Sequence, residues 1–230
     1  MSLLGAEELQ AVLLSLKVAA TATAFGLPVA LVVAHALARG RFWGRSLLDA
    51  ATHLPLVLPP VATGYALLLL LGHRGILGAA LEQAGIVFAF RWTGAALAAG
   101  IMAFPLMVRP IRLSIEAIDR EVDEVARTLG AGPVIRFITV TVPLAAPGLA
   151  AGAVLGFAKA LGEFGATITF VAAIPGETLT LPTAIYQATQ VPGAETRALA
   201  LCAVAAVIAI SAVLLSDAVS KALIDRRERA

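Results

Sequence analysis

Two oppositely charged residues, Lys159 and Glu163, lie four positions apart in an otherwise apolar stretch of the chain. Residues with this spacing meet on one face of a helix, where an ammonium and a carboxylate attract each other. If the stretch spans a membrane, each charge costs about 2.5–3.5 kcal/mol at the centre, so such charges usually have a role. Two interpretations remain open: Lys159 draws an anion into a pore whose outer gate Glu163 shapes, or the two residues form a structural ion pair.

Two threonines and two prolines are further candidates for a translocation path. Thr167 and Thr169 follow Glu163 in a glycine-flanked segment, where their hydroxyls can line a pore or bond to their own helix. Pro59 and Pro60 interrupt an earlier apolar stretch, because proline removes helix hydrogen bonds. The carbonyls freed there need protein or water beside them. This segment is therefore expected to face a pore or a dimer seam, with a kink for packing as the alternative.

Other kinds of chemistry find no support in the sequence. Ser15, His35 and Asp49 form no recognisable catalytic arrangement, and His35, His53 and His73 lack the spacing of metal ligands. None of the three lysines stands in a Gly-Lys-Ser/Thr motif, so the chain has no phosphate-binding P-loop. We expect no catalytic residue, metal site or cofactor.

The composition is that of an integral membrane protein. The 230 residues are 60% hydrophobic and 14% charged, with a formal net charge of +2 and a mean hydropathy of +0.92. Soluble domains are about 45–50% apolar and about 25% charged. A disordered chain, a disulfide scaffold and a nucleic-acid module are excluded. We predict an all-α membrane protein.

Five stretches are apolar and long enough to be membrane spans, which need about 20 residues. They are 9–37, 47–71, 93–113, 144–171 and 198–219. Gly162, Glu163 and Gly165 are expected to break the fourth into a helix and a re-entrant piece, and a sixth span remains an alternative. Lys17, in the first span, is expected to extend toward the membrane surface rather than bind substrate. Cys202, in the fifth, is expected to be a packed free thiol.

The distribution of basic residues predicts the orientation. Connector 38–46, the segment 109–143 and the C-terminal tail together hold twelve Lys and Arg residues, whereas the alternate connectors hold three. By the positive-inside rule, the N-terminus lies outside, and the segment 109–143 and the C-terminus lie in the cytoplasm. The acidic N-terminal residues do not resemble a cleavable signal peptide, so the first span is expected to be retained.

The connector after the third span has the pattern of an amphipathic helix over 115–129. Its apolar residues recur at steps of three and four, and charged residues fill the other faces. Gly130 and Pro133 are expected to end this helix, and a second short helix, 134–140, leads to Pro143. Such a helix could lie on the bilayer or on its own bundle. Its five acidic residues would be repelled by anionic lipids, which favours a protein partner.

The same connector resembles the EAA loop of ABC importer permeases. That pattern is Glu-Ala-Ala, three residues, Gly, nine residues, then Ile-x-Leu-Pro. Glu124, Val125, Ala126 and Gly130 match its first part, and the final four positions are Val140-Thr141-Val142-Pro143. The spacing agrees throughout, with aliphatic replacements at residues 125, 140 and 142.

Further motifs are similar to those of ModB-type molybdate permeases. They are His53-Leu-Pro-Leu-Val-Leu-Pro-Pro60, Phe104-Pro-Leu-Met-Val-Arg109, Ala126-Arg-Thr-Leu-Gly-Ala-Gly132, Leu161-Gly-Glu-Phe-Gly-Ala-Thr-Ile-Thr-Phe170, Ile174-Pro-Gly-Glu-Thr178 and Gln190-Val-Pro-Gly-Ala-Glu195. Together these motifs extend over most of residues 9–217. The resemblance implies a type I ABC importer permease fold, with 1–230 forming one transmembrane domain and 115–143 its coupling loop.

The resemblance also implies partners. It implies a homodimer with one pore in the bacterial inner membrane, a periplasmic molybdate-binding protein, and separate ATP-binding subunits that hold the two loops. Glu124 and Gly130 would fix the helix and its turn, and ATP-driven closure would move the loops together. The subunit itself would not be an enzyme.

Three alternatives to a molybdate permease remain. Within the class, the substrate could be sulfate, thiosulfate or tungstate, because tetrahedral oxyanions differ mainly in size. A secondary transporter would need inverted repeats and sites for coupling ions. An integral-membrane enzyme would need a convergent acid, base or metal cluster. Neither set of features is found in the sequence.

Overall fold

The computed structural model describes residues 5–228, except for the side chains of residues 213 and 215–228, and these residues form helices and no strand. The elements are α1 (Ala6–Arg39), α2 (Arg45–Val57), α3 (Pro60–Leu71), α4 (Gly78–Gln83), α5 (Trp92–Glu116), α6 (Arg120–Thr128), α7 (Pro133–Arg136), the π-helix η1 (Phe137–Thr141), α8 (Val142–Leu144), α9 (Ala146–Leu161), α10 (Gly165–Val171), α11 (Leu181–Thr189) and α12 (Glu195–Glu228). The predicted all-α class is confirmed.

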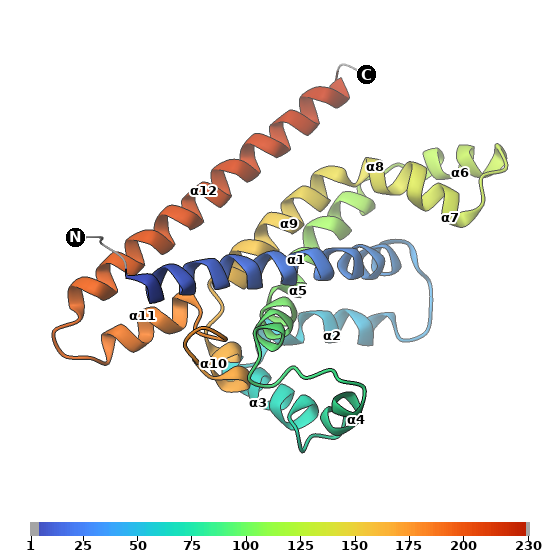
Figure 1. Ribbon diagram of the computed structural model, residues 1–230. Helices are drawn as coiled ribbons and strands as arrows, with labels where there is room; N and C mark the ends of the chain where they lie inside the picture. Colours follow the sequence, from blue (N-terminus) through green and yellow to red (C-terminus); the bar gives the residue numbers. More distant parts are fainter. Residues whose placement is uncertain (1–4, 229–230) are drawn as a thin grey trace.

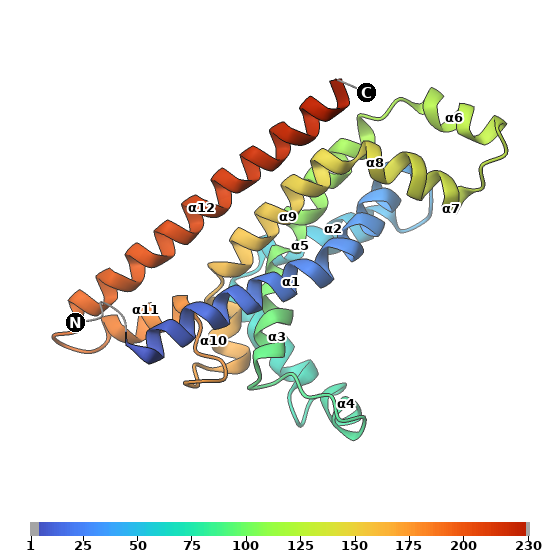
Figure 2. The same ribbon diagram turned by 45° about the horizontal axis from the view of Figure 1, so that its top comes forward.

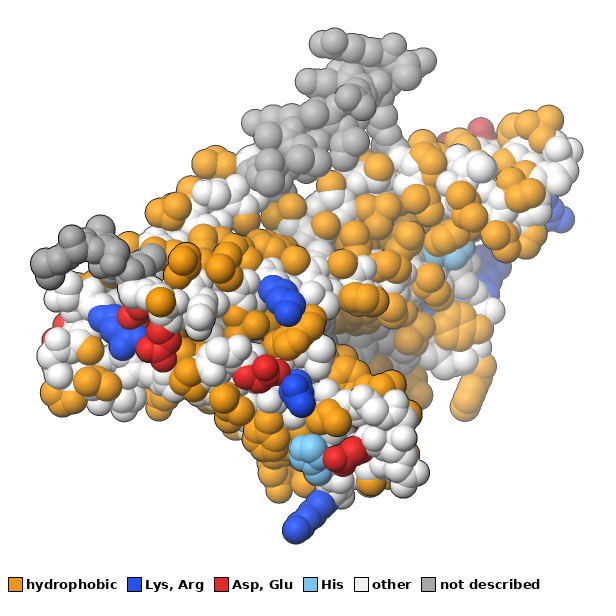
Figure 3. All heavy atoms as spheres, in the orientation of Figure 1, with side chains coloured by type: hydrophobic (Ala, Val, Ile, Leu, Met, Phe, Trp, Pro, Cys, Tyr) orange, Lys and Arg blue, Asp and Glu red, His pale blue; other side chains and the backbone are white. Residues whose placement is uncertain are grey.

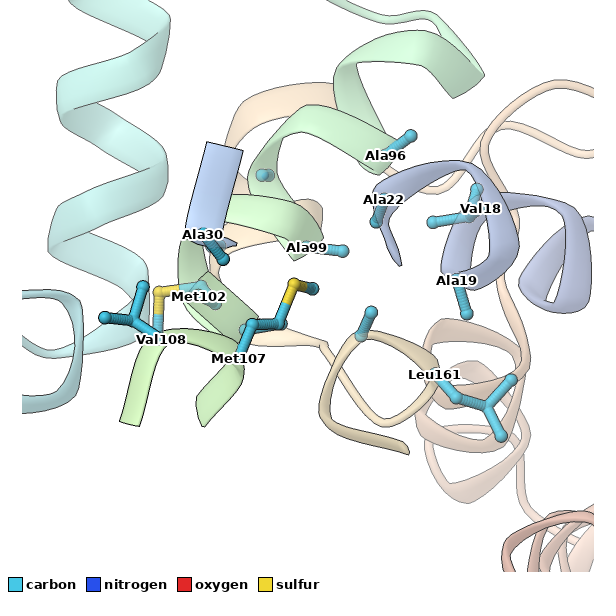
Figure 4. Packing of buried hydrophobic residues seen from close by; sticks show 14 of the residues in the cluster. Val18, Ala19, Ala22, Ala30, Ala96, Ala99, Met102, Met107, Val108 and Leu161 are labelled. Carbon is cyan, nitrogen blue, oxygen red and sulfur yellow. The ribbon is translucent and has the colours of Figure 1, made fainter. Parts of the chain in front are cut away.

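The core forms where α5 packs between α1 and α9 (Figures 1 and 2). Small side chains allow this close approach: Figure 4 shows Ala22 of α1 beside Ala96 and Ala99 of α5, all of which are buried. On α9, Gly148, Gly152 and Gly156 face α5 at intervals of one helical turn. A Cβ atom on Gly152 would lie 2.8 Å from the carbonyl oxygen of Met107. The α5–α9 contact thus depends on glycine.

Five apolar crossings are present if each bent helix pair is counted as one. Three single helical segments are long and apolar enough to cross a membrane: α1, α5 and the Glu195–Ala212 part of α12. The other two are pairs, with α2 and α3 bent by 114° and Pro133–Leu144 bent by 71° against Ala146–Leu161.

The expected helix breaks occur at the proline and glycine positions. The bend between α2 and α3 falls at Pro59, and Pro60 begins α3. The stretch 144–171 divides, as predicted, into α9 and α10, with Gly162 following the last residue of α9. The two breaks lie together: a Cβ atom on Gly165 would lie 2.7 Å from Cβ of Pro60, and one on Gly64 would overlap the backbone of Ala166.

The two ends of the bundle carry different elements. The start of α1 lies near α11 and the start of α12, whereas α6 to α8 and the C-terminal end of α12 lie toward the opposite end (Figures 1 and 2). At the first end, Arg197 contacts Glu7 at 3.3 Å and Glu8 at 2.5 Å. The Oγ of buried Ser15 accepts a hydrogen bond from the backbone N–H of Leu181 at 2.6 Å.

Large apolar side chains remain exposed along the spans (Figure 3). The expectation of a packed Cys202 is wrong: its side chain is exposed, because α12 touches the bundle mainly along one side. Among the tail residues counted for orientation, the side chains of Lys221, Arg226 and Arg227, and the whole of Arg229, lie outside the described part of the chain.

Candidate functional site

The loop between α5 and α9 is built from short, separately capped helices. The prediction of one helix over 115–129 is wrong at its start, because α5 continues to Glu116 and fully buried Ile115 belongs to the core. A new helix, α6, begins after Asp119, whose Oδ1 accepts the backbone N–H of Glu121 at 3.0 Å. This side-chain cap stabilises a helix start at this position. The chain therefore changes direction between residues 117 and 119.

The end of α6 depends on glycine, as the sequence predicted. Gly130 has a φ of 85°, a conformation that costs other residues about 1–2 kcal/mol. Pro133 then occupies the first position of α7, where its missing N–H is tolerated. The second helix, expected over 134–140, is present as α7 followed by the π-helix η1.

The amphipathic helix α6 turns its apolar face outward and its charged face toward the bundle, the reverse of an ordinary surface helix. Its apolar side chains point away from the bundle: Val122 is 43% exposed, Val125 57% and Leu129 82%. The charged residues on the opposite face line a cleft against the ends of α1 and η1; they are Arg120, Asp123, Glu124 and Arg127. A surface helix normally buries its apolar side. An apolar face directed outward indicates that another molecule covers it.

The second part of the loop adds to this exposed apolar surface. Val134 is 67% exposed, Ile135 57% and Ile138 58%. We call the six apolar side chains the outer loop patch; they are Val122, Val125, Leu129, Val134, Ile135 and Ile138. Hydrophobic atoms are visible at this end of the molecule in Figure 3.

Two contacts fix the loop to the bundle, through Arg39 and His35, and a third joins two of its short helices. The guanidinium of Arg39, the last residue of α1, donates to the carbonyl oxygens of Ile115 at 3.0 Å and Ile118 at 2.7 Å. Arg136 of α7 forms an ion pair with Asp123 of α6 at 3.0 Å. His35 of α1 lies edge-on to Phe137 of η1, with 4.8 Å between the ring centroids. A force on α6 would therefore reach α1 as well as α9.

The predicted EAA residues lie in the same loop but have different surroundings. Glu124 is exposed at the cleft and makes no hydrogen bond or ion pair within the described part of the chain. Val125 belongs to the outer loop patch, Gly130 forms the turn, and Val140 lines the cleft. Pro143 lies in α8, where the loop returns to α9.

The pair in the fourth apolar stretch is an ion pair that also positions a helix. Nζ of Lys159 lies 2.6 Å from Oε2 of Glu163. The other carboxylate oxygen of Glu163 accepts the backbone N–H of Ala166, in the first turn of α10, at 3.0 Å. Glu163 is buried, whereas the Lys159 side chain is 30% exposed. Glu163 thus joins the end of α9 to the start of α10.

The remaining candidates lie around the same break. Thr167 is buried and donates to the carbonyl oxygens of Glu163 and Phe164, and Thr169 donates to that of Gly165 at 2.8 Å. Pro59 and Pro60 are exposed at the bend beside α10. The prolines and threonines are therefore brought together, although both hydroxyls bond to their own helix.

Lys17 and the three histidines lie apart from this break. Nζ of Lys17 lies 3.6 Å from the centroid of the Trp92 ring, a cation–π contact. His35 packs against the loop, His53 contacts Asp49, and His73 contacts Glu82.

The residues that fix the loop were not identified from the sequence. Arg39 is 76 residues from Ile115, and His35 is about 100 residues from Phe137. In the sequence, Arg39 is one more basic residue on the positive side of a span. Only the fold shows that it binds the end of α5.

The fold and the loop define a class of protein. Residues 26–229 match the model of the family described as "Binding-protein-dependent transport system inner membrane component". The chain belongs to this family, whose members are transport components rather than enzymes.

Curated relatives narrow the comparison. The chain is 53% identical over 211 residues to the molybdenum transport system permease protein ModB of Escherichia coli K12, covering 91% of this chain and 92% of the relative. It is 50% identical to ModB of Haemophilus influenzae, covering 93% and 94%. A sulfate transport permease, CysW of Synechococcus elongatus, is 39% identical over 72% of this chain and 57% of its own length.

Solved structures share the fold at low sequence identity. A bacterial ABC transporter for alginate import matches with a TM-score of 0.74 and 19% identity, covering 95% of this chain and 80% of that one. The MetNI methionine ABC transporter, in an inward-facing conformation, matches with a TM-score of 0.71 and 17% identity, covering 94% and 95%.

Proposed function

We propose that this chain is the membrane-spanning permease subunit of an ATP-driven importer that carries molybdate across the bacterial inner membrane. The support is the 53% identity to a molybdenum transport permease over nine tenths of both chains. The sulfate permease shares 39% identity over a smaller part of the chain, which disfavours the sulfate alternative. The proposed partners are a second copy of the chain, two ATP-binding subunits and a periplasmic molybdate-binding protein.

The observation that carries the proposal is the inverted amphipathic helix α6. Its outward apolar face offers a docking surface, and its charged face is directed toward the bundle. In the proposed complex an ATP-binding subunit covers the outer loop patch. ATP-driven closure would displace the loops of the two protomers. The ion pair of Arg136 with Asp123 would keep α6 and α7 together during that displacement, and Arg39 and His35 would transmit it to α1.

The bent span α2–α3 supports the proposal of a homodimer. In α2 only Thr52 is buried, and in α3 only Thr63, Gly64 and Leu67 are. A helix pair this exposed, with a bend that frees backbone groups, requires protein or water beside it. We place it at the seam between protomers or along the pore.

For the translocation path we retain Lys159, Glu163, Thr167, Thr169, Pro59 and Pro60 as candidates. Because Glu163 neutralises Lys159, the pair is not a permanent cationic trap for an oxyanion. Conduction requires weak binding, which backbone N–H groups and hydroxyls at the junction of α3 and α10 can provide. In this proposal Glu163 is a positioning residue that fixes the start of α10 beside Pro60.

The proposed orientation places the N-terminus in the periplasm and the loop and C-terminus in the cytoplasm. It is supported by the count of basic residues and by the position of α6 at the end opposite the start of α1. We further propose that 1–230 acts as one transmembrane domain, with 115–143 as its coupling loop.

The docking step is tested by co-expressing the chain with its ATP-binding subunit and purifying the complex in detergent. Val125→Asp and Leu129→Asp place a charge on the outer loop patch at exposed positions, so the fold should persist. We expect each to reduce copurified ATP-binding subunit at least about tenfold, as expected for loss of a central apolar contact. Ile76→Asp is the control, since Ile76 is 82% exposed in the connector between α3 and α4. Equal recovery with all three variants would contradict docking on this face.

A further inference from the structure

The charged face of α6 lines a cleft of about 360 Å³, to which the proposed transport function assigns no ligand. The cleft lies between α6, the end of α1 and η1. Five arginines line it, namely Arg39, Arg41, Arg120, Arg127 and Arg136, against two carboxylates, Asp123 and Glu124. Its walls are therefore predominantly cationic.

Most of this positive charge is not neutralised by the residues that the structure describes. Among these residues, Arg136 is the one arginine of the five that is paired with a carboxylate, that of Asp123. The side chain of Arg39 bonds to backbone carbonyls, and the side chains of Arg41, Arg120 and Arg127 make no hydrogen bond or ion pair in the described part of the chain.

Two buried nitrogen atoms at the cleft lack partners. Nδ1 of His35 and Nε of Arg136 are both buried without a hydrogen-bond partner among the described residues. Nε of Arg136 is a donor, and an unpartnered buried donor costs about 1–3 kcal/mol, so such an atom usually has an acceptor. Both residues line the cleft, and an oxyanion seated there would supply an acceptor to Arg136, and to His35 in the tautomer whose Nδ1 carries the proton.

The surroundings place the cleft at the level of lipid headgroups. Arg41 is followed directly by Phe42, which is 44% exposed, and Trp43, which is fully exposed. Aromatic residues at the end of a span are typical of the membrane interface. Val32 on α1, 60% exposed, lies two turns before Arg39, so the apolar surface ends close to the cleft.

The acidic residues of the loop would repel an anion in the cleft less strongly than the sequence suggested, because most of their carboxylates are already bonded within the chain. Glu116 is paired with Arg112 at 2.8 Å, Asp123 is paired with Arg136, and Asp119 caps α6. Glu124 is the one carboxylate in the cleft without an ion pair in the described part of the chain.

We propose that this cleft binds a phosphate group, that of an anionic phospholipid of the inner leaflet, and thereby holds the coupling loop against the membrane. Basic pockets at the ends of spanning helices bind such headgroups through charge-assisted hydrogen bonds. The proposal is independent of which substrate is transported. Arg41, which follows α1, and Arg127 of α6 both line the cleft, and in this proposal they hold the phosphate in place.

The test measures retained lipid by native mass spectrometry of the purified full chain, offered phosphatidylglycerol and phosphatidylcholine in equal amounts. We expect phosphatidylglycerol to be preferred, and Arg41→Gln combined with Arg127→Gln to reduce that preference about tenfold. The control combines Arg74→Gln with Arg109→Gln, two exposed arginines without ion pairs in the described chain. It should keep the preference.

A second arm offers inorganic phosphate alone and follows thermal unfolding. Protection by phosphatidylglycerol at concentrations where inorganic phosphate gives none supports a lipid headgroup as the source. Protection by inorganic phosphate that the double variant abolishes would support the site with a free anion as its occupant, and would overturn the lipid assignment. Equal lipid preference in the double variant and wild type would overturn the site.

Discussion

The ammonium of Lys159 lies 2.6 Å from a carboxylate oxygen of buried Glu163. The other carboxylate oxygen of Glu163 accepts a hydrogen bond from the start of α10. The same carboxylate therefore neutralises Lys159 and fixes the break between α9 and α10. This relationship favours the structural interpretation of the two charges over the view of Lys159 as a free anion attractor.

Removal of Lys159 alone should therefore destabilise the protein. Lys159→Met leaves the Glu163 carboxylate buried without its counter-ion, at a cost on the order of 3–5 kcal/mol. Adding Glu163→Gln removes the unpaired charge and should recover most of the lost thermal stability. Unfolding temperature in detergent measures both. If Lys159→Met is as stable as wild type but transports no molybdate, Lys159 acts on the substrate and the structural interpretation is wrong.

The α5–α9 contact predicts a strong effect of a single methyl group. A Cβ atom on Gly152 would lie 2.8 Å from a backbone oxygen of α5, so Gly152→Ala should lower the free energy of unfolding by about 1–3 kcal/mol. Gly100→Ala is the matched control, because its added Cβ would be 3.6 Å from the nearest atom and alanine favours a helix. Denaturation in mixed micelles compares the two variants. A Gly152→Ala protein as stable as the control would contradict the tight packing.

The stability of the turn after α6 should depend on the backbone conformation of Gly130 and not on space for a side chain. No atom lies within 4 Å of a Cβ placed on Gly130, yet its φ of 85° disfavours any other residue by about 1–2 kcal/mol. Gly130→Ala should raise the rate of proteolysis in the loop several-fold. Gly132→Ala serves as control, since Gly132 has a φ of −65° and equally open space. Identical proteolysis of both variants would show that the turn does not require the left-handed conformation.

Arg39 should stiffen the junction between α5 and α6. Arg39→Gln removes the hydrogen bonds from the guanidinium to the carbonyls of Ile115 and Ile118. Amide hydrogen exchange at residues 117–121 should then accelerate about tenfold, which corresponds to the loss of roughly one charged hydrogen bond. Arg109→Gln, at an exposed position, should leave exchange there unchanged. Hydrogen–deuterium exchange with mass spectrometry resolves this segment. Unaltered exchange in Arg39→Gln would remove Arg39 from the proposed force path.

Local signals in the sequence predicted the breaks and turns well. Proline restricts the backbone and glycine loosens it, each within one or two residues. The effects of Pro59, Pro60, Gly162, Gly165 and Gly130 could therefore be inferred without the fold. The periodicity of 115–129 also located the loop, but it could not show that Ile115 belongs to the core of the bundle. Nor could it show which face of α6 points outward.

Long-range contacts could not be predicted. The bonds from Arg39 to Ile115 and Ile118, and the fit of Gly152 against Met107, join residues far apart in the sequence. Glycines in α9 read equally well as weak helix positions or as packing positions. The exposure of Cys202 could not be predicted for a related reason. An apolar run indicates that a helix lies in the membrane, but it does not show which side of the helix meets its neighbours.

Uptake of molybdate into proteoliposomes tests the central claim most directly. The chain is reconstituted with its ATP-binding subunit and binding protein, and radiolabelled molybdate is followed with tungstate and sulfate as competitors. We predict that molybdate accumulation requires ATP and the binding protein and persists when ion gradients are collapsed. Sulfate should compete at least about tenfold less effectively than unlabelled molybdate. A tenfold selectivity needs a difference in binding free energy of only about 1.4 kcal/mol. Uptake that proceeds without ATP on an ion gradient alone, or that prefers sulfate, would contradict the account.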